Sequence, residues 1–448
     1  MAASRGEWSS KIGFIFAAAG SAIGLGNIWR FPYIVGENGG AAFVFLYVIF
    51  VIAIGLPYMF AELALGRSVQ RNPVGAIEAI KPGSAWMSVG YLGVITGLGI
   101  LSFYGVIAGW TVGYIFKMFL GNPGDFGQFI GDPWTVISLF AFFIFITALI
   151  VHGGVSGGIE KWSKILMPIF FSLLVVLIIY SVNLDGAEKG LAFYLMPDFT
   201  KITGKTILAA LGQAFFSLSL GMGLMITYGS YVSKKENLVS SAIYIALFDT
   251  LIAIMAGLII FPALFAMGKS PEQGAKLVFV VFPELFMNMP GGMIIGGLFF
   301  ILLSVAALTS TISLLEVPVA YVVDERKMNR KKVVWIVAFV AFSIGLPSAL
   351  SQGASDFWTN WGWIPEWLAA PDFLSQMSFI FGDFSLAFGA FMLSIFIGWV
   401  WGAKNAADEI EIGSPVFKKA RWLWLFMIRF FIPIVIFLIL LNLFGIFN

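Results

Sequence analysis

Long apolar stretches alternate along the chain with shorter segments that hold most of the charged residues. A helix needs about 20 mostly apolar residues to cross a bilayer. Eleven stretches approach or exceed that length, at approximately 11–35, 41–68, 86–119, 133–151, 162–183, 207–231, 239–267, 291–323, 333–350, 373–401 and 421–446. The pattern predicts an all-α integral membrane protein with 11 transmembrane helices.

Glycines and polar residues interrupt the first stretch. Residues 20–32 read GSAIGLGNIWRFP, with three glycines in seven residues followed by Asn27 and Arg30. Glycine weakens a helix by about 1 kcal/mol relative to alanine, and an arginine at mid-bilayer costs at least about 2.5 kcal/mol. A plain membrane anchor carries neither, so this stretch indicates a broken helix at a polar site.

The sixth stretch is interrupted in the same way, because residues 213–223 read QAFFSLSLGMG. Each interrupted stretch opens a set of five, and an odd number of helices per set inverts the second set relative to the first. Paired glycine-interrupted helices are typical of inverted-repeat transporters. We therefore expect a 5+5 inverted repeat with broken helices 1 and 6.

The broken turns are candidate binding sites. An unwound turn exposes backbone N–H and C=O groups, which must meet protein, ions or a polar ligand because hydrocarbon cannot satisfy them. Half-helix N-termini favour a carboxylate, and exposed carbonyls favour a cation. The glycines alone could instead serve close helix packing, but Asn27, Ser217 and Ser219 beside them favour a binding site.

Other apolar stretches also contain polar side chains. Thr309 and Ser310 place adjacent hydroxyls in the eighth stretch, and oxygen ligands suit a hard cation, although such hydroxyls can also bond back to their own helix. Asp249 lies within the seventh stretch, where a carboxylate is a functional candidate by default. Glu62 and Glu316 are nearer the inner face and are interpreted as structural partners of nearby donors.

The composition agrees with the membrane prediction. Of 448 residues, 60% are hydrophobic and 11% are charged, and the mean hydropathy is +0.95, whereas soluble domains carry about 25% charged residues. The net charge of +2 gives no reason to expect a nucleic-acid partner. The absence of cysteine excludes disulfides and thiolate metal sites. The N-terminal MAASRGEWSSK has no apolar region typical of a cleavable signal peptide.

The positive residues predict an orientation. With the N-terminus in the cytoplasm, 18 of the 26 lysines and arginines fall on the cytoplasmic side, which is the bias that membrane proteins show. An odd number of spans then places the C-terminus outside. We expect a multi-pass protein of the cell (inner) membrane with a cytoplasmic N-terminus and an extracytoplasmic C-terminus.

Three motifs resemble the neurotransmitter:sodium symporter family. They are GSAIGLGNIWRFPYIVGENGGAAF at 20–43, GQAFFSLSLGMG at 212–223 and AALTSTISLLE at 306–316, which resemble that family's first, sixth and eighth helices. The resemblance covers nearly the whole chain and points to the bacterial branch of eleven-helix amino-acid transporters with the LeuT fold.

The resemblance implies a domain order along the chain. A cytoplasmic N-terminal gate segment (1–10) precedes a first five-helix repeat (11–183), and an extracellular loop (184–206) follows. The inverted second repeat (207–401) contains an extracellular lid loop (268–290) with an apolar run that suggests a short helix. A loop and the eleventh helix (402–448) complete the chain.

The resemblance also implies two sodium sites and a substrate site. The first sodium would meet Ala22, Asn27, Ser217 and Asp249, together with the substrate carboxylate. The second would meet the carbonyls of Gly20, Ile23 and Ala306 and the hydroxyls of Thr309 and Ser310. The substrate would be bounded by Ala22, Leu25, Gly26, Ile100, Tyr104, Phe216, Ser217, Ser219, Met222, Ser310 and Leu314.

Gates follow from the same resemblance. Arg30 and Asp383 match the outer pair, with Tyr104 and Phe216 closing beneath them. Arg5, Trp8 and Asp324, near Ser230 and Tyr231, match the inner gate. Gly158 and Pro168 are spaced like the family motif that lets the inner part of helix 5 unwind.

One departure from the family pattern concerns chloride. In chloride-dependent members the position of Asp249 is asparagine and a serine lies four residues later, whereas this chain has Ala253 there. The chloride-site neighbours by resemblance are Tyr47, Gln213 and Ser217. A fixed carboxylate would supply the charge that chloride supplies elsewhere. Asp249 could take up a proton once sodium leaves, which would make proton counter-transport possible.

The resulting hypothesis is a sodium-coupled symporter of a small neutral L-amino acid that works by alternating access, and not an enzyme. A hydrophobic or aromatic substrate is favoured, and a small aliphatic one is the alternative. An ion channel would also use broken helices, but no repeated filter loop is present. A sensor that binds without transport remains a further alternative.

Overall fold

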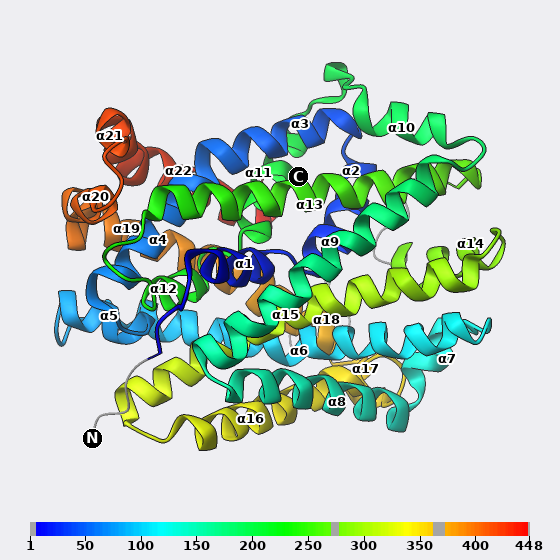
Figure 1. The fold of residues 1–448 in the computed structure, drawn as a ribbon, viewed down its shortest axis with the longest axis horizontal. Helices are drawn as coiled ribbons and strands as arrows, with labels where there is room; N and C mark the ends of the chain where they lie inside the picture. Colours follow the sequence, from blue (N-terminus) through cyan, green and yellow to red (C-terminus); the bar gives the residue numbers. More distant parts are fainter. Residues whose placement is uncertain (1–5, 270–276, 362–371, 447–448) are drawn as a thin grey trace.

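The computed structural model describes residues 6–269, 277–361 and 372–446, which form helices joined by short connections (Figure 1). In chain order the helices are α1 (Lys11–Ala22), α2 (Phe31–Glu37), α3 (Ala41–Phe50), α4 (Leu56–Val69), α5 (Pro73–Ile80), α6 (Met87–Phe119), α7 (Phe126–Gly131), α8 (Pro133–His152), α9 (Lys161–Val182), α10 (Ala187–Leu195), α11 (Gly204–Ser217), α12 (Leu224–Gly229), α13 (Leu238–Ala266), α14 (Phe282–Met287), α15 (Gly292–Arg326), α16 (Arg330–Leu350), α17 (Asp356–Thr359), α18 (Phe373–Met377), α19 (Leu386–Ile395), α20 (Ala403–Glu411), α21 (Phe417–Phe426) and α22 (Ile432–Leu443).

Wider π-helical turns precede or continue several of these helices. They lie at Gly26–Arg30, Val51–Gly55, Val155–Glu160, Leu277–Val281, Ser378–Ser385, Phe396–Gly402 and Met427–Phe431. A 3₁₀ turn spans Phe199–Lys201. Through these turns α3 and α4 form one span, as do α18 to α20 and α21 to α22.

Nine helices in the described ranges are long and apolar enough to cross a bilayer, and the bent pair formed by α1 and Gly26–Glu37 raises the number to ten. Apolar helices of this kind confirm the prediction of a multi-pass membrane protein. The two halves of the bent pair differ in direction by 51°, which places a break inside the first predicted span.

The sixth predicted span, 207–231, differs from a continuous helix. It consists of α11 and α12, which are separated by the stretch 218–223 and are each too short to span a bilayer alone. Backbone conformation explains the interruption, since Gly221 and Gly223 have φ values of +85° and +72°. Glycine adopts these values without steric cost, but they cannot continue a right-handed helix.

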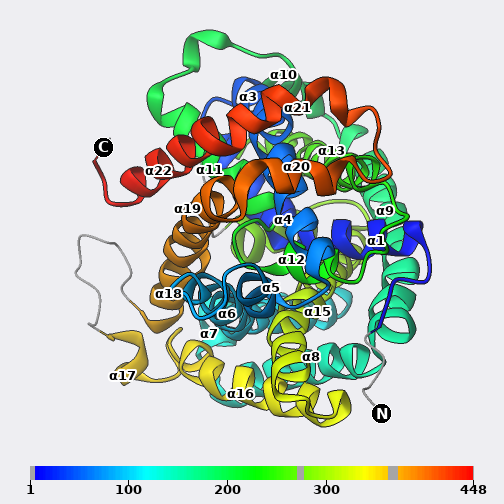
Figure 2. The ribbon, with the colours of Figure 1, turned by 90° about the vertical axis from the view of Figure 1, so that its left-hand side faces the viewer.

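The helices run side by side, and most of their long axes follow one direction of the molecule (Figure 1). The two longest, α6 and α15, pack against each other. Viewed along the bundle, α4 and α12 lie near its middle, while α8, α9, α16 and α19 lie around them (Figure 2). Of the broken helices, α1 packs on α13 and α15, and α12 packs on α4 and α15.

Side-chain caps define where several helices begin. Ser10 accepts a hydrogen bond from Gly13 N at 3.1 Å and caps α1. Asp132 caps α8 just before Pro133, and Thr203 forms a capping box with Thr206 at the start of α11. These residues satisfy N–H groups that the first helical turn leaves without partners.

Short helices lie outside the predicted spans. The stretch 184–206 contains α10, and the described part of 268–290 contains the expected short helix, α14, which packs on α15 through Phe282 and Phe299 with ring centroids 5.3 Å apart. Residues 270–276 of the predicted lid loop lie outside the described ranges, as does Arg5 of the predicted inner gate.

Candidate functional site

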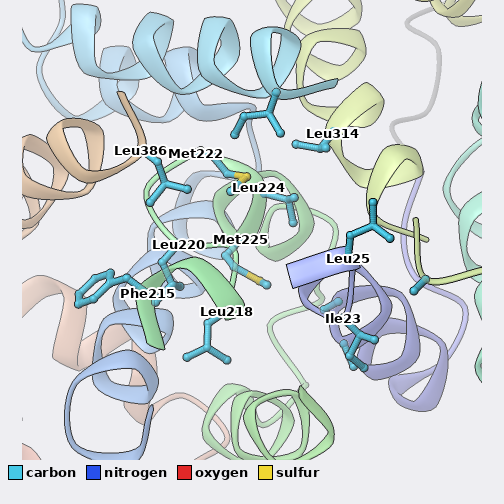
Figure 3. Packing of buried hydrophobic residues seen from close by; sticks show 14 of the residues in the cluster. Ile23, Leu25, Phe215, Leu218, Leu220, Met222, Leu224, Met225, Leu314 and Leu386 are labelled. Atoms are coloured by element: carbon cyan, nitrogen blue, oxygen red, sulfur yellow. The ribbon is translucent and has the colours of Figure 1, made fainter. Parts of the chain in front are cut away.

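A cavity of about 740 Å³ lies where the two helix breaks meet. Its lining includes every residue that the sequence predicts for the substrate: Ala22, Leu25, Gly26, Ile100, Tyr104, Phe216, Ser217, Ser219, Met222, Ser310 and Leu314. The apolar side chains of both breaks are buried together, with Ile23 and Leu25 on one side and Leu218 to Met225 on the other (Figure 3). Residues far apart in the chain thus form one compartment.

Glycine allows the first break to approach its neighbours closely. A Cβ atom at Gly24 would lie 2.6 Å from Ser310 Oγ and 2.7 Å from the Tyr104 hydroxyl. A Cβ at Gly26 would lie 2.7 Å from the ring of Phe216. Any side chain at these positions would fill the space at which the break meets the cavity.

The backbone of the first break presents polar groups to the cavity. The N–H of Leu25 donates to the hydroxyl of Tyr104 at 2.8 Å, and the carbonyl of Gly26 accepts from Gln213 Nε2 at 3.5 Å. Tyr104 and Leu25 both line the cavity. A carboxylate that replaced the bond between Leu25 and Tyr104 would find an N–H and a phenolic O–H as donors.

A buried carboxylate lies behind the two breaks. Asp249 on α13 is fully buried and accepts hydrogen bonds from Asn27 Nδ2 at 2.7 Å and from Ser217 Oγ at 2.7 Å. The Tyr47 hydroxyl lies 3.2 Å from its second oxygen and 2.9 Å from Ser217 Oγ. The described side chains that bond Asp249 are neutral donors, so a cation at this cluster would find an uncompensated negative charge if Asp249 is ionised.

A second group of oxygens lies between α1 and α15. Thr309 Oγ1 donates to the carbonyl of Ala306 at 2.9 Å and lies 3.4 Å from the carbonyl of Ile23. Ser310 Oγ lies 3.3 Å from the same Ile23 carbonyl. A Cβ at Gly20 would be 3.2 Å from Thr309 Cβ. Of the five residues predicted for the second sodium site, Gly20 and Ile23 at the end of α1 thus approach Thr309 and Ser310 of α15, and the Ala306 carbonyl lies beside Thr309.

Arg30 and Asp383 lie next to each other at the cavity. Arg30 Nη2 is 3.3 Å from Asp383 Oδ1, and both side chains are partly exposed. The guanidinium also lies over the ring of Phe216, 4.3 Å from its centroid. This cation–π contact links the charged pair to Phe216, next to the second helix break.

The segment before α1 packs on the residues after α12. Trp8 Nε1 donates to the carbonyl of Tyr228 at 3.0 Å, and its ring contacts that of Tyr231 at 6.1 Å. Asp324, also predicted for the inner gate, accepts from the N–H of Asn72 at 3.1 Å. Of the residues predicted for the inner gate, Trp8 therefore lies near Tyr231, whereas Asp324 contacts Asn72 at the start of α5.

The segment before α1 is also joined to the helix predicted to unwind. Glu160 accepts hydrogen bonds from Ser9 N at 2.7 Å, from Ser10 Oγ at 2.8 Å and from Lys164 Nζ at 2.6 Å. Gly158 lies in the π-helical turn before α9, and Pro168 lies inside α9. In this structure the region between Gly158 and Pro168 is helical.

The two remaining embedded carboxylates have structural partners, as predicted from their positions in the sequence. Glu62 on α4 accepts from the N–H of Gly221 at 2.7 Å and so supports the second break. Glu316 on α15 accepts from the Tyr231 hydroxyl at 2.7 Å and from Arg330. Neither lines the cavity.

Several residues of the cavity wall were not predicted from the sequence. They are Ser21, Trp29, Tyr33, Phe103, Ile107, Trp110, Phe126, Ile130, Leu224, Phe279 and Ser313, among others. Phe279 belongs to the predicted lid loop and stacks on Phe126 with ring centroids 5.2 Å apart. The apolar run around Phe279 was the one available signal, because the other positions look like ordinary membrane-helix residues.

The described chain, including this site, is similar to known membrane transporters. The model of the sodium:neurotransmitter symporter family matches residues 5–123 and 127–447. The uncharacterized sodium-dependent transporter YhdH of Bacillus subtilis (strain 168) is 38% identical over 98% of each chain. An uncharacterized sodium-dependent transporter of Haemophilus influenzae is 34% identical over 98% of each chain. The chain therefore belongs to the sodium:neurotransmitter symporter family.

A solved structure shares the fold. The crystal structure of MhsT in complex with L-phenylalanine superposes with a TM-score of 0.88 at 44% sequence identity, over 98% of this chain and 100% of that one. Family membership and this likeness together establish a membrane transporter with the LeuT fold, as the resemblance of the three motifs predicted.

Proposed function

We propose that this protein is a sodium-coupled symporter of neutral L-amino acids with hydrophobic or aromatic side chains, and that it requires no chloride. The observation that carries the proposal is the meeting of both helix breaks at one cavity, next to the buried Asp249 cluster. The similarity to MhsT, whose structure holds L-phenylalanine, supports an amino acid as the substrate.

Sodium would bind at two positions. At the first, the ion would lie among Asn27, Ser217 and Asp249 and would replace the hydrogen bond between Asn27 and Asp249. The carbonyl of Ala22 and the substrate's own carboxylate would complete its ligands. At the second, the ion would lie between α1 and α15, where Gly20, Ile23, Ala306, Thr309 and Ser310 supply only oxygens. Oxygen ligands without sulfur or imidazole suit a hard cation.

Sodium and substrate binding would be coupled because the substrate carboxylate and the first sodium ion carry opposite charges and would lie in contact. The substrate carboxylate would meet the N–H groups near Leu25 and Gly26 and the hydroxyl of Tyr104, and it would also touch the first sodium. Each ligand then improves the binding of the other, which is reciprocal linkage. The ammonium group would meet carbonyls of the two breaks, including those of Ala22 and Phe216.

Alternating access would use two gates around this fixed site. Arg30 and Asp383 would close the outer side above Tyr104 and Phe216. Trp8 and Asp324, together with Arg5 outside the described residues, would close the inner side. Opening inward would involve unwinding of helix 5 between Gly158 and Pro168. This scheme assumes eleven spans, a 5+5 inverted repeat and a cytoplasmic N-terminus.

Asp249 makes chloride unnecessary in this proposal. Its carboxylate lies next to Tyr47 and Ser217, two of the residues that resemble a chloride site, while Ala253 offers no hydroxyl there. A fixed negative charge would take the place of the anion. Once sodium has left, Asp249 could carry a proton back, which would make the protein a sodium symporter with proton counter-transport.

Uptake into proteoliposomes tests the function directly. We expect accumulation of labelled L-phenylalanine with an inward sodium gradient, unchanged when gluconate replaces chloride. Tryptophan, tyrosine and leucine should compete, whereas glutamate and lysine should not, because an unpaired charge in the apolar part of the pocket is costly. Uptake confined to small aliphatic amino acids such as alanine or leucine, with no competition by tryptophan or tyrosine, would favour the small aliphatic alternative. Binding without sodium-driven accumulation would contradict symport.

A further inference from the structure

Four serines line one part of the cavity and come from three separate segments. Ser21 belongs to α1, Ser219 to the second break, and Ser310 and Ser313 to α15. Ser21 and Ser313 are buried, with exposed fractions of 2% and 0%. Buried hydroxyls must find hydrogen-bond partners in the protein or in a bound molecule.

Three of these serine hydroxyls donate their protons to other oxygens of the protein. Ser21 Oγ donates to Ser313 Oγ at 2.7 Å, and Ser313 Oγ donates to the carbonyl of Ser310 at 2.8 Å. Ser219 Oγ donates to the carbonyl of Ser21 at 3.3 Å. A hydroxyl has one proton and two lone pairs. These bonds therefore use the proton of each hydroxyl within the protein and leave the Oγ atoms of Ser21 and Ser219 as acceptors.

Apolar side chains line the cavity as well. Ile100, Met222 and Leu314 line the same cavity and are nearly fully buried. In such surroundings an acceptor without a donor is costly, and a pocket built to bond a donor discriminates against analogues that lack it. A purely aliphatic side chain could fill the space but could not pair with the serine oxygens.

We propose that Ser21 and Ser219 form an acceptor subsite for a hydrogen-bond donor on the side chain of the substrate. The subsite favours side chains that end in an indole N–H or a phenolic O–H over phenyl and aliphatic side chains of similar size. Ser313 is a positioning residue, because it accepts the proton of Ser21 and so turns the Ser21 lone pairs toward the cavity. The inference rests on the proposed function.

The test compares two ligands that differ in one donor. Sodium-dependent uptake of labelled L-phenylalanine is measured in proteoliposomes and inhibited by L-tryptophan or by 3-benzothienyl-L-alanine, in which sulfur replaces the indole N–H. Net hydrogen-bond energies correspond to about a 2- to 12-fold difference in affinity. We expect tryptophan to inhibit at a concentration lower by that factor in the unmodified protein.

Three variants locate the effect. Ser21→Ala should bring the ratio between the two inhibitors close to one, with both inhibitors measured against the phenylalanine uptake of that variant itself. Ser219→Gly should lower the ratio in part, and glycine suits this position because Ser219 has a φ of +53°. Ser313→Ala should also lower it, since the Ser21 proton becomes free to turn to the cavity. Ser102→Ala is the matched control, because Ser102 is buried and its hydroxyl donates to the carbonyl of Gly99 in its own helix.

The outcomes separate this inference from the proposed function. Equal inhibition by both ligands in the unmodified protein, with sodium-dependent uptake intact, overturns the acceptor subsite alone. An inhibitor ratio that is unchanged in both Ser21→Ala and Ser219→Gly also overturns the acceptor subsite. Lack of sodium-dependent uptake of any neutral amino acid by the unmodified protein overturns the proposed function instead.

Discussion

Asn27 and Asp249 are 222 positions apart in the chain, yet the side-chain nitrogen of Asn27 lies 2.7 Å from a carboxylate oxygen of Asp249. The contact joins the first helix break to α13 inside the bundle. Ser217, the last residue of α11, bonds the other carboxylate oxygen at 2.7 Å. Both breaks are therefore attached to one buried acid, so an ion bound there would act on both.

Removing the charge of Asp249 should abolish most transport. Asp249→Asn keeps the shape but removes the negative charge that balances sodium in a low-dielectric setting. Adding Ala253→Ser makes the pocket resemble the chloride-dependent pattern. We expect the double variant to regain part of the uptake in chloride and none in gluconate, at fixed sodium concentration.

Two results would contradict this fixed-charge account. One is a chloride requirement of the unmodified protein. The other is equal uptake by Asp249→Asn and by the unmodified protein in gluconate.

Loss of the two hydroxyls on α15 should weaken sodium binding. In Thr309→Ala/Ser310→Ala the oxygens beside the Ile23 carbonyl are reduced in number, so the sodium concentration for half-maximal uptake should rise several-fold. Maximal uptake at saturating sodium should change less. Thr311→Ala is the control, because Thr311 on the same helix bonds Thr147 and Leu308 instead. An unchanged sodium dependence in the double variant would rule out this site.

Pro168→Ala should slow opening toward the inner side. Proline inside a helix removes one backbone hydrogen bond and weakens the helix by about 3 kcal/mol, so alanine should hold the inner part of helix 5 together. Single-turnover release of labelled substrate should become slower while binding in detergent persists. Gly158→Ala is not an equivalent test, since its Cβ would lie 2.1 Å from the carbonyl of Ile150. A normal release rate in Pro168→Ala would exclude the unwinding role.

Breaking the buried ion pair of Arg67 should destabilise the fold. Arg67 on α4 is fully buried, bonds Glu409 of α20 at 2.7 Å and also donates to the carbonyl of Glu236. Arg67→Met leaves the buried carboxylate of Glu409 with fewer partners, which costs about 3 kcal/mol or more. We expect a clear fall in the thermal unfolding midpoint in detergent.

Arg421 provides the comparison for Arg67. Its partners Asp408 and Glu411 are more exposed, and exposed pairs contribute about 0–1 kcal/mol. Arg421→Met should therefore shift the midpoint much less. Equal shifts in the two variants would mean that burial of the Arg67 pair is not what stabilises α20 against α4.

Much of the fold could be predicted from local sequence. The apolar stretches indicate membrane helices because length and hydropathy alone decide whether a helix suits a bilayer. The breaks could also be predicted, since Gly221 and Gly223 permit backbone conformations that end a helix. The extent of the second break could not be predicted. The sixth stretch is long enough for one span, but in the structure it forms two short helices, because residues 218–223 leave the helical conformation.

The residues of the site could be predicted only in part from local sequence. Asn27, Asp249, Thr309 and Ser310 were noticeable because polar groups are rare in apolar helices. Their grouping into a sodium and substrate site came from the resemblance to a family, since spacing in one chain cannot show which helices face each other.

Tertiary structure alone decided the remaining contacts. Nothing in the sequence relates Ser21 to Ser313 or Arg67 to Glu409, because each pair depends on the packing of helices hundreds of residues apart. Serine in a membrane helix can bond its own backbone as readily as a neighbour, so its role depends on what faces it. The sequence determined which groups need partners, and the packing of α1, α4, α15 and α20 determined which partners they have.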